Sequence, residues 1–188
     1  MGWFFQAYAV DLDQAHGAIG SGDDELLRRV EQKFEDELDD DEELAEVVRY
    51  VVSGTLDDGD DLEDYFVEAF KMICETLSVL EEGNGPFSSD WPGAIDTGLS
   101  ELNIDSIRFR EFEGGKVLTF PDGIEYARIY GEWTHTQCVA AVERWEGTTA
   151  EQRLALDPEV LDWVEIGIRL ASMAAKTPGY GVAGFIWM

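Results

Sequence analysis

The chain has a short apolar segment near its start and another at its end, and these two segments limit its possible folds more than any other feature. Residues 3–10 (WFFQAYAV) and residues 182–188 (VAGFIWM) are rich in aromatic and β-branched side chains. Apolar runs of this length are typical of well-buried strands. We therefore predict that both ends of the chain lie in the middle of one sheet and that helices cover this sheet.

The segments between the two ends have the periodicity of helices. The strongest signal covers residues 62–80, where apolar residues keep to one face, and weaker amphipathic patterns cover residues 23–38 and 44–52. The predicted fold class is therefore α+β. We expect a single domain over residues 1–188, in which a small mixed sheet contains both terminal strands and several helices cover it.

Capping residues mark where three later helices begin. Thr134 with Gln137 and Thr148 with Glu151 have the spacing of capping boxes, and Pro158 follows Asp157 at a first helical position.

The middle of the chain contains the signals of a loop and a hairpin. Residues 81–93 are rich in Gly, Pro and Ser, which predicts a loop after the helical half of the chain. Residues 94–102 then predict a short helix. Beyond it, the segments SIRFREF and KVLTF predict two strands joined in a hairpin across residues 113–115.

The net charge narrows the classes of partner. The 41 Asp and Glu residues against 13 Lys and Arg residues give a formal charge of −28, which repels phosphate backbones and anionic lipids. We expect no nucleic-acid or membrane partner, and attraction toward basic proteins, polyamines or metal cations. The alternative is that the acidity serves only solubility or adaptation to a salty cytoplasm.

The cysteines and the N-terminal segment indicate a cytoplasmic protein. Cys74 and Cys138 each lie within an apolar helical pattern, which predicts buried free thiols in a reducing compartment. The apolar residues 3–10 lack a preceding basic region and are too short to cross a bilayer. The oligomeric state is left open.

No catalytic motif is present in the sequence. A serine elbow, a Walker loop, a dinucleotide-binding glycine motif and a zinc-protease motif are all absent. Glu132, His135 and Cys138 are spaced to meet on one helical turn as a thiolate and imidazole pair or a partial metal site, but a capped helix with a core-facing cysteine explains the same residues. We expect no catalytic residues, no metal site and no cofactor.

Two acidic runs and one aromatic loop are the candidate binding features. Residues 35–46 contain nine carboxylates and residues 57–64 contain six, without the ligand spacing of a calcium loop. Such runs are either a solvated face, a docking surface for a basic partner or a mimic of a nucleic-acid backbone. Aromatic residues on the loop are either interface anchors or plugs that pack it onto the body. The candidate partner-binding residues are Asp39, Asp40, Asp41, Glu42, Asp57, Asp60, Asp61, Phe87 and Trp91.

Several segments together resemble a known family. The opening MGWFFQAYAVDLD, the segment ELAEVVRYVVSG, the stretch ARIYGEWTHTQCVAAVERW, the RLALDPEVL turn and the C-terminal helix and strand resemble, in this order, the YfbM-like family of uncharacterised bacterial proteins. The stretch from MICETLSVL through SSDWPGAIDTGLSEL is similar to a related actinobacterial family of unknown function. The resemblance implies one α+β domain with its terminal strands in one sheet, and an accessory or immunity-type role. It brings no catalytic residues, and the acidic residues 35–43 depart from the family pattern.

The leading functional hypothesis is a non-catalytic acidic binding protein. Its partner is expected to be a basic protein, for instance a nuclease-like toxin that it neutralises as an immunity protein. A small-ligand binder or enzyme that uses carboxylates in a pocket is the first alternative, and it requires carboxylates with raised pKa values in a concave site. A housekeeping protein whose acidity serves solubility is the second, and it requires acidity spread evenly over the surface.

Overall fold

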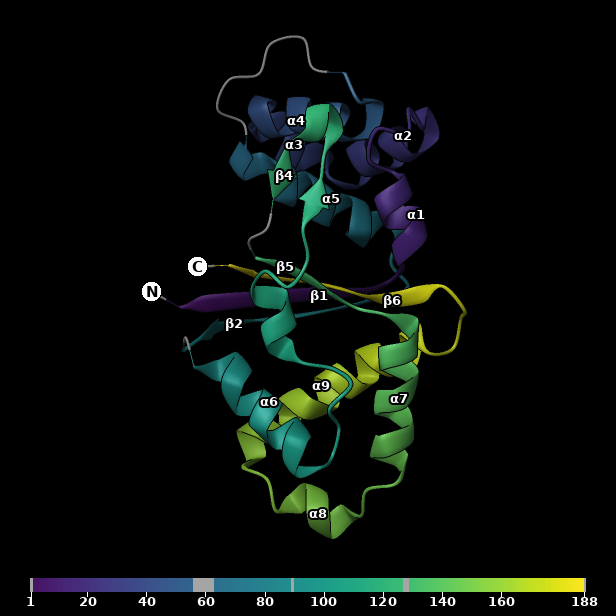
Figure 1. Cartoon of the computed structure of the whole chain (residues 1–188). Helices are drawn as coiled ribbons and strands as arrows, with labels where there is room; N and C mark the ends of the chain where they lie inside the picture. Colours follow the sequence, from purple (N-terminus) through teal and green to yellow (C-terminus); the bar gives the residue numbers. More distant parts are fainter. Residues whose placement is uncertain (1, 56–62, 89, 127–128, 188) are drawn as a thin grey trace. The chain divides into compact units, whose positions relative to one another are not determined.

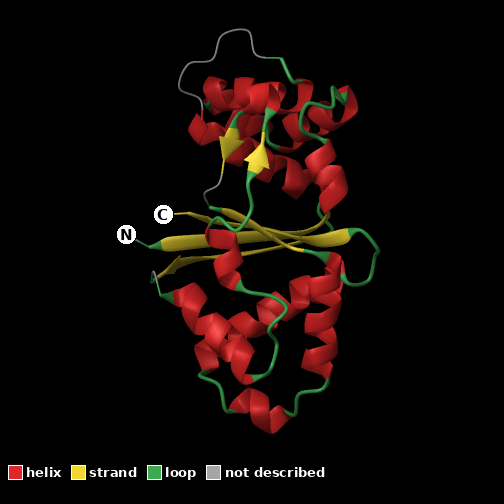
Figure 2. Ribbon diagram, viewed as in Figure 1, coloured by secondary structure: helices red, strands yellow, loops and turns green. Residues whose placement is uncertain are grey.

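The fold is α+β and contains two compact units. The computed structural model describes residues 2–55, 63–88, 90–126 and 129–187. The sheet unit consists of residues 1–12, 79–116 and 127–188, and the helical unit consists of residues 13–78 and 117–126. Figure 1 shows the course of the chain through both units, and Figure 2 shows the same view by secondary structure.

The sheet unit contains a four-stranded sheet and the helices that pack on it. Its strands are β1 (Trp3–Asp11), β2 (Leu80–Phe87), β5 (Tyr130–Trp133) and β6 (Tyr180–Trp187). Its helices are α6 (Trp91–Glu101), the 3-10 helix η1 (Phe109–Glu113), α7 (His135–Glu146), α8 (Ala150–Leu154) and α9 (Pro158–Ala174).

Both terminal strands are central in this sheet, as predicted. The strand order is β2-β1-β6-β5, so β1 and β6 are neighbours and each has a partner on both sides. The predicted mixed sheet is wrong, because all three pairings are antiparallel. Leu80 on β2 lies opposite Ala9 on β1, and Val182 on β6 lies opposite Trp133 on β5. The segment that joins β1 to β2 therefore leaves and re-enters the sheet at the same end, and so does the segment that joins β5 to β6. Each of these two pairs of strands is antiparallel for this reason.

The core of the sheet unit lies between the sheet and helices α6, α7 and α9. Phe5 and Ala7 from β1 and Ile186 from β6 belong to one cluster of buried residues with side chains from these helices. Aromatic rings fill its centre: the centroid of the Phe5 ring lies 5.7 Å from that of Trp91 and 6.0 Å from that of Trp163. The two apolar ends of the chain thus form the centre of the sheet face on which the helices pack.

The hairpin predicted from SIRFREF and KVLTF is wrong. Residues 109–113 form η1, and in the second segment the strand is limited to Leu118–Thr119 (β3), which pairs with Glu125–Tyr126 (β4). Phe109 and Phe112 are both fully buried, and a spacing of three places both rings on one side of a 3-10 helix, whereas a strand would separate them. Burial of both rings therefore favours the helical turn.

The loop predicted at residues 81–93 is wrong for its first half, which forms a strand. Residues 80–87 form β2, which is an edge strand of the sheet, and α6 begins at Trp91. Glycine and proline predict a loop because they weaken a central strand, but an edge strand tolerates both. Gly83 and Pro86 are therefore compatible with the pairing to β1.

The helical unit contains the amphipathic helices predicted for the first half of the chain. Its elements are α1 (Leu12–Gly17), α2 (Asp24–Lys33), α3 (Glu35–Asp40), α4 (Glu42–Ser53), α5 (Glu63–Leu77), β3, the short 3-10 turn η2 (Pro121–Gly123) and β4. The helix predicted over residues 62–80 ends at Leu77, because Leu80 already belongs to β2. Val30, Val47 and Phe70 are fully buried in this unit.

Residues 117–126 are fastened to the helices of this unit. The hydroxyl of Tyr50 on α4 donates to the carbonyl oxygen of Pro121 at 2.8 Å, and the rings of Phe66 and Phe120 stack at 5.1 Å. Burial, followed by the neighbouring Asp122 carboxylate, raises the pKa of Tyr50 to about 12. The phenol therefore stays protonated and keeps its donor role.

Most predicted helix starts are confirmed. Thr134 and Gln137 form a capping box, and Asp157 caps α9 by accepting from the backbone N–H of Glu159 at 2.9 Å. The capping box predicted at Thr148 is wrong by one residue, because Thr149 is the N-cap of α8 and pairs with Gln152. Thr148 does not cap α8, because its hydroxyl donates to the carbonyl oxygen of Trp145.

Candidate functional site

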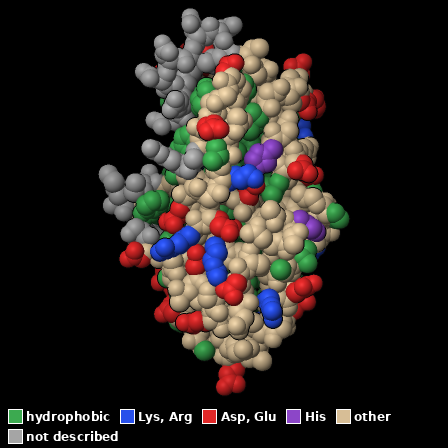
Figure 3. Space-filling view, in the orientation of Figure 1, with side chains coloured by type: hydrophobic (Ala, Val, Ile, Leu, Met, Phe, Trp, Pro, Cys, Tyr) green, Lys and Arg blue, Asp and Glu red, His purple; other side chains and the backbone are tan. Residues whose placement is uncertain are grey.

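The largest group of exposed carboxylates lies on α3 and the first turns of α4. We call this group the acidic surface. It consists of Glu35, Asp36, Glu37, Asp39, Asp40, Asp41, Glu42, Glu43 and Glu46. Asp41 is partly buried and the other members are exposed. The first predicted acidic run is therefore a solvent-facing surface of the helical unit. Figure 3 shows one face of the molecule with its Asp and Glu side chains in red.

Two breaks in the helices shape the acidic surface. Phe34 is buried and leaves helical geometry, which ends α2 and starts α3. Asp41 is extended, and its side chain accepts from the backbone N–H of Leu44 at 3.0 Å to cap α4. Leu38 and Leu44 are buried, so each short helix is anchored by an apolar side chain while its carboxylates face solvent.

No described cation forms an ion pair with the acidic surface, although Arg28 and Arg49 line a hollow together with Glu35 and Asp39. The ion pairs within the helical unit join Arg28 with Glu25, Arg49 with Glu31, Lys33 with Glu75, and Lys71 with Glu68. None of the ion pairs among the described residues uses a carboxylate of the acidic surface. Unpaired charges packed this densely create a strong local negative potential.

Tyr65 on α5 adds an aromatic side chain to the acidic surface. The Asp41 charge, followed by burial and the Glu43 charge, raises the pKa of this phenol. Tyrosine is enriched at protein interfaces relative to the rest of the surface. Sequence reasoning missed Tyr65 because it lies within the apolar pattern of a helix predicted as core.

The remaining predicted binding residues belong to the second acidic run and to the segment around Phe87 and Trp91. Asp57, Asp60 and Asp61 lie outside the described residues. Phe87 ends β2 and its side chain is not described. Trp91 is 7% exposed and packs against Phe5, Phe109 and Trp163, so it is a core residue. This is the packing role that the sequence left open for the aromatic residues.

A second group of carboxylates lies in the sheet unit. A shallow groove of about 730 Å³ is lined by Asp96, Arg108 and Arg110, among others. Burial raises the pKa of Asp96, although its carboxylate accepts from the backbone N–H groups of Phe109 at 2.6 Å and Arg110 at 3.4 Å. Both carboxylate oxygens therefore hold the start of η1 in place, and this contact explains why a half-buried carboxylate is present.

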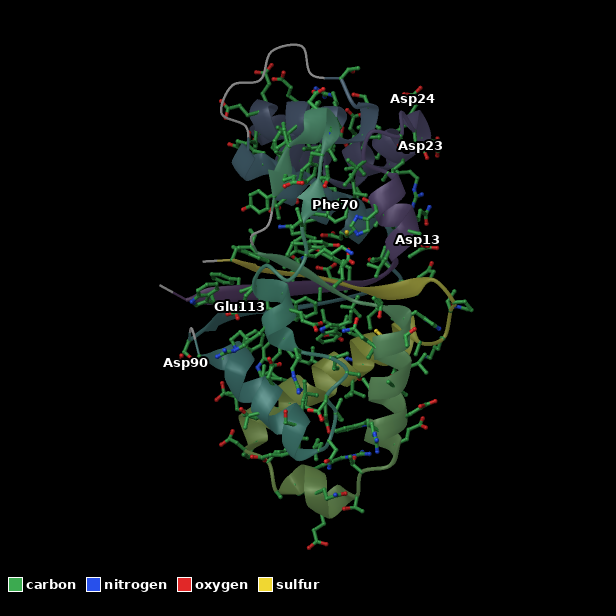
Figure 4. The ribbon with its side chains drawn as sticks, in the orientation of Figure 1. Asp13, Asp23, Asp24, Phe70, Asp90 and Glu113 are labelled. Carbon is green, nitrogen blue, oxygen red and sulfur yellow. The ribbon has the colours of Figure 1, made fainter. Side chains whose placement is uncertain are left out.

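Glu111 and Glu113 on η1 also have carboxyl groups whose pKa values are shifted by burial. Burial raises the pKa of each carboxyl, and the neighbouring Asp96 charge raises both further. Glu111 accepts from the side-chain amide of Gln137 at 3.4 Å, which opposes the rise. Figure 4 labels Glu113 on this turn.

These three carboxylates predict that mild acid stabilises the protein. A carboxyl whose pKa is higher in the folded chain binds its proton at a higher pH there than when unfolded, so stability rises as pH falls toward the raised values. We expect the melting temperature to be higher at about pH 5 than at pH 7.5, because the gain develops as the pH approaches the ordinary carboxyl range from above. The opposite sign applies to Glu25 and Asp105, whose pKa values are lowered by Arg28 and Arg108, but their effect falls below the ordinary carboxyl range of about pH 4.

Thermal melts monitored by circular dichroism test this expectation. The E111Q/E113Q variant should lose part of the difference between the two pH values, whereas E143Q/E146Q, which neutralises exposed carboxylates of α7, should retain more of it. A melting temperature that falls steadily from pH 7.5 to about pH 5 would show that carboxylates stabilised by cations or hydrogen-bond donors dominate instead.

The residues weighed as a thiolate and imidazole pair serve structural roles. Burial raises the pKa of the Cys138 thiol to about 12, and its sulfur contacts the carbonyl oxygen of Trp133 at 3.8 Å. The Nδ1 atom of His135 lies 3.2 Å from the carbonyl oxygen of Ala174, and Glu132 forms an ion pair with Lys116 at 3.1 Å. Cys74 is likewise a buried free thiol.

The described part of the chain offers neither a metal cluster nor a membrane span. Among those residues, no group of three or more His, Cys, Asp or Glu side chains is arranged to hold a metal ion. Within the same ranges, no helix combines the length and the apolar character that spanning a bilayer requires.

The chain belongs to a family defined as a domain of unknown function, DUF7691, whose family model matches residues 1–187. One family domain therefore spans both the sheet unit and the helical unit. No curated protein and no solved structure matches the chain significantly.

Proposed function

We propose that this protein is a non-catalytic binding protein whose acidic surface docks a basic protein partner. The observation that carries the proposal is the acidic surface itself, a dense group of solvent-facing carboxylates that form no ion pair among the described residues. Charged surfaces of this kind accelerate association with partners of opposite charge and disfavour partners of like charge.

The uneven distribution of charge supports a specific surface over a general solubility role. The 76 residues of the helical unit contain 24 Asp and Glu and five Lys and Arg, for a net charge of −19. The 112 residues of the sheet unit contain 17 and eight, for a net charge of −9. The smaller unit thus holds two-thirds of the net charge, whereas a solubility role alone predicts acidity spread evenly.

The small-ligand alternative receives less support from the structure. It requires a carboxylate that lies in a pocket, has a raised pKa and is free to act on a ligand. Asp96 satisfies the first condition, but both of its oxygens accept backbone hydrogen bonds from η1. Burial raises its pKa, and both of its oxygens are already engaged in holding the start of η1.

A nuclease-like toxin is the partner that the proposal favours. Proteins that act on nucleic acids present basic surfaces to the phosphate backbone, and an acidic surface that covers such a face excludes the substrate. The resemblance to the YfbM-like family and its implied immunity-type role point in the same direction. The protein then neutralises the toxin by occupying its basic face.

A capture experiment with charge-matched variants tests the proposal. The docking variant neutralises exposed members of the acidic surface: D36N, D39N, D40N and E42Q. The control variant neutralises the same number of exposed carboxylates in the sheet unit: E143Q, E146Q, E151Q and E165Q. Asp41 is left intact because it caps α4.

The wild type and the control should retain the same basic protein from a lysate of the source organism, and the docking variant should lose it. Exposed substitutions of this kind typically alter stability by about 0.5 kcal/mol or less each, so the fold of each variant can be verified by its melting curve. Equal loss of the partner in both variants would show that binding depends on the net charge of the protein and not on the position of the acidic surface. Retention of no basic protein by the wild type would contradict the proposal.

A further inference from the structure

A small cavity opens between the first turns of α6 and α9 in the sheet unit. Its volume is about 170 Å³, and its apolar lining includes Trp91, Trp163 and Val160. The two indole rings are nearly perpendicular at 81°, with centroids 4.6 Å apart. Because both rings also belong to the core cluster, the shape of this lining is fixed by the fold.

The size of the cavity limits the class of ligand. Pockets for drug-sized molecules usually measure about 300 Å³ or more. A cavity of about 170 Å³ therefore fits one slender group, such as a single amino-acid side chain. An apolar lining of tryptophan and valine favours a ligand with a hydrocarbon stem.

The carboxylates around the cavity define the charge of the ligand. Asp90, Asp157 and Glu159 also line it, and none of them takes part in an ion pair among the described residues. Figure 4 labels Asp90 where the chain enters α6. An aliphatic stem with a positive end satisfies both the apolar lining and these carboxylates.

Helix capping accounts for only part of this negative charge. Asp157 caps α9, whereas Asp90 makes no side-chain cap bond to α6. The starts of two helices carry a partial charge of about +0.5 each, against three full negative charges. Arg110 lines the neighbouring groove together with Asp90. Its single positive charge reduces the net negative charge around the cavity but does not cancel it.

We propose that this cavity binds an alkylammonium group, namely a lysine side chain of a basic protein. The four-carbon stem lies against the tryptophan and valine side chains, and the ammonium group remains at the rim beside the carboxylates. Ammonium groups are also attracted to the electron-rich faces of indole rings. The site lies in the sheet unit and is independent of the acidic surface, so either proposal can fail without the other.

Titration with n-butylammonium as a lysine side-chain probe tests the proposal. Binding is followed through the indole N–H signals of Trp91 and Trp163 in ¹H–¹⁵N NMR spectra at constant ionic strength. We expect saturable shifts at millimolar concentrations, and about tenfold weaker binding of n-butanol, which has the same stem without the charge. Shifts that sodium chloride reproduces, or equal binding of n-butanol, would overturn the ammonium site. Tighter binding of n-butylguanidinium would overturn the assignment to lysine.

Variants at exposed positions keep the test independent of folding. E159Q should weaken n-butylammonium binding about fivefold, whereas E165Q, on the same helix but outside the cavity, should leave it unchanged. A94L should block the site, because Ala94 is exposed and lines the cavity. Equal weakening by E159Q and E165Q, or undiminished binding to a folded A94L protein, would contradict the proposal.

Discussion

Deletion of residues 182–188 is expected to abolish cooperative unfolding of the sheet unit. β6 pairs with β1 on one side and with β5 on the other, so the deletion removes two ladders of backbone hydrogen bonds at once. Residues 181–186 are all buried, and Val182 and Ile186 belong to the core cluster. Loss of each large apolar side chain costs about 2 to 5 kcal/mol, and a domain is stable by only about 5 to 15 kcal/mol in total.

Thermal melts and size-exclusion chromatography measure this effect. The point variant I186A should melt cooperatively at a lower temperature, since it removes one buried side chain and keeps the strand. The truncated chain should show no cooperative transition and should elute as an expanded or aggregated species. A sharp transition near that of the full chain would show that the sheet does not depend on its C-terminal strand.

The substitution G131A is expected to have the second largest effect on stability. A Cβ atom at this position on β5 would lie 1.8 Å from the carbonyl oxygen of Glu111 and 2.8 Å from the backbone nitrogen of Phe112. Both atoms belong to the backbone of η1, so no side chain can rotate away to make room. We expect a loss of about 4 kcal/mol or more, which exceeds the usual cost of overpacking a core.

Chemical denaturation of G131A and a matched glycine variant tests this expectation. G17A is the control, because a Cβ atom at Gly17 meets no atom within 4 Å and Gly17 ends a helix. This variant should match the wild type or gain up to about 1 kcal/mol. Similar midpoints for G131A and the wild type would show that η1 does not pack closely on β5.

The ends of the chain were predictable because each combines length, apolar continuity and β-branched or aromatic residues. The run WFFQAYAV has Gln6 as its one polar residue, so a mostly buried strand or a buried helix accommodates it, and eight residues are short for a helix. The caps at Thr134 and Asp157 were predictable for a different reason. Their geometry is local, and the residues that complete it lie within three positions.

The segment from Ile107 to Phe120 was not predictable from local pattern. Its aromatic and β-branched residues favour strands, and the turn at η1 depends on distant partners: the Asp96 carboxylate that binds its first N–H groups and the glycine that leaves room on β5. Tertiary contacts of this kind override strand propensity. β2 was missed for the converse reason, since only its place at the sheet edge makes its glycines acceptable.

The candidate site was predictable in part. Charge density alone identified residues 35–46, because nine carboxylates in twelve positions cannot be buried. Tyr65 and the cavity beside Trp91 and Trp163 could not be inferred, because each depends on side chains from separate helices. Trp91 itself looked like a surface anchor on a loop, whereas the start of α6 turns it into the core.

Association kinetics with the captured basic protein test whether the acidic surface is the docking site. Rate constants are measured over a range of salt concentrations for the wild type, for the docking variant (D36N, D39N, D40N and E42Q) and for the control variant (E143Q, E146Q, E151Q and E165Q). Long-range attraction acts mainly on the association rate and is screened by salt. Both variants lose the same charge, so only its position differs between them.

We expect the docking variant to associate about three- to tenfold more slowly than the wild type at low salt, with a flatter dependence on salt concentration. The control variant should associate at nearly the wild-type rate. Equal slowing of both variants, or rates that none of these substitutions changes, would contradict a specific docking role for the acidic surface on α3 and α4.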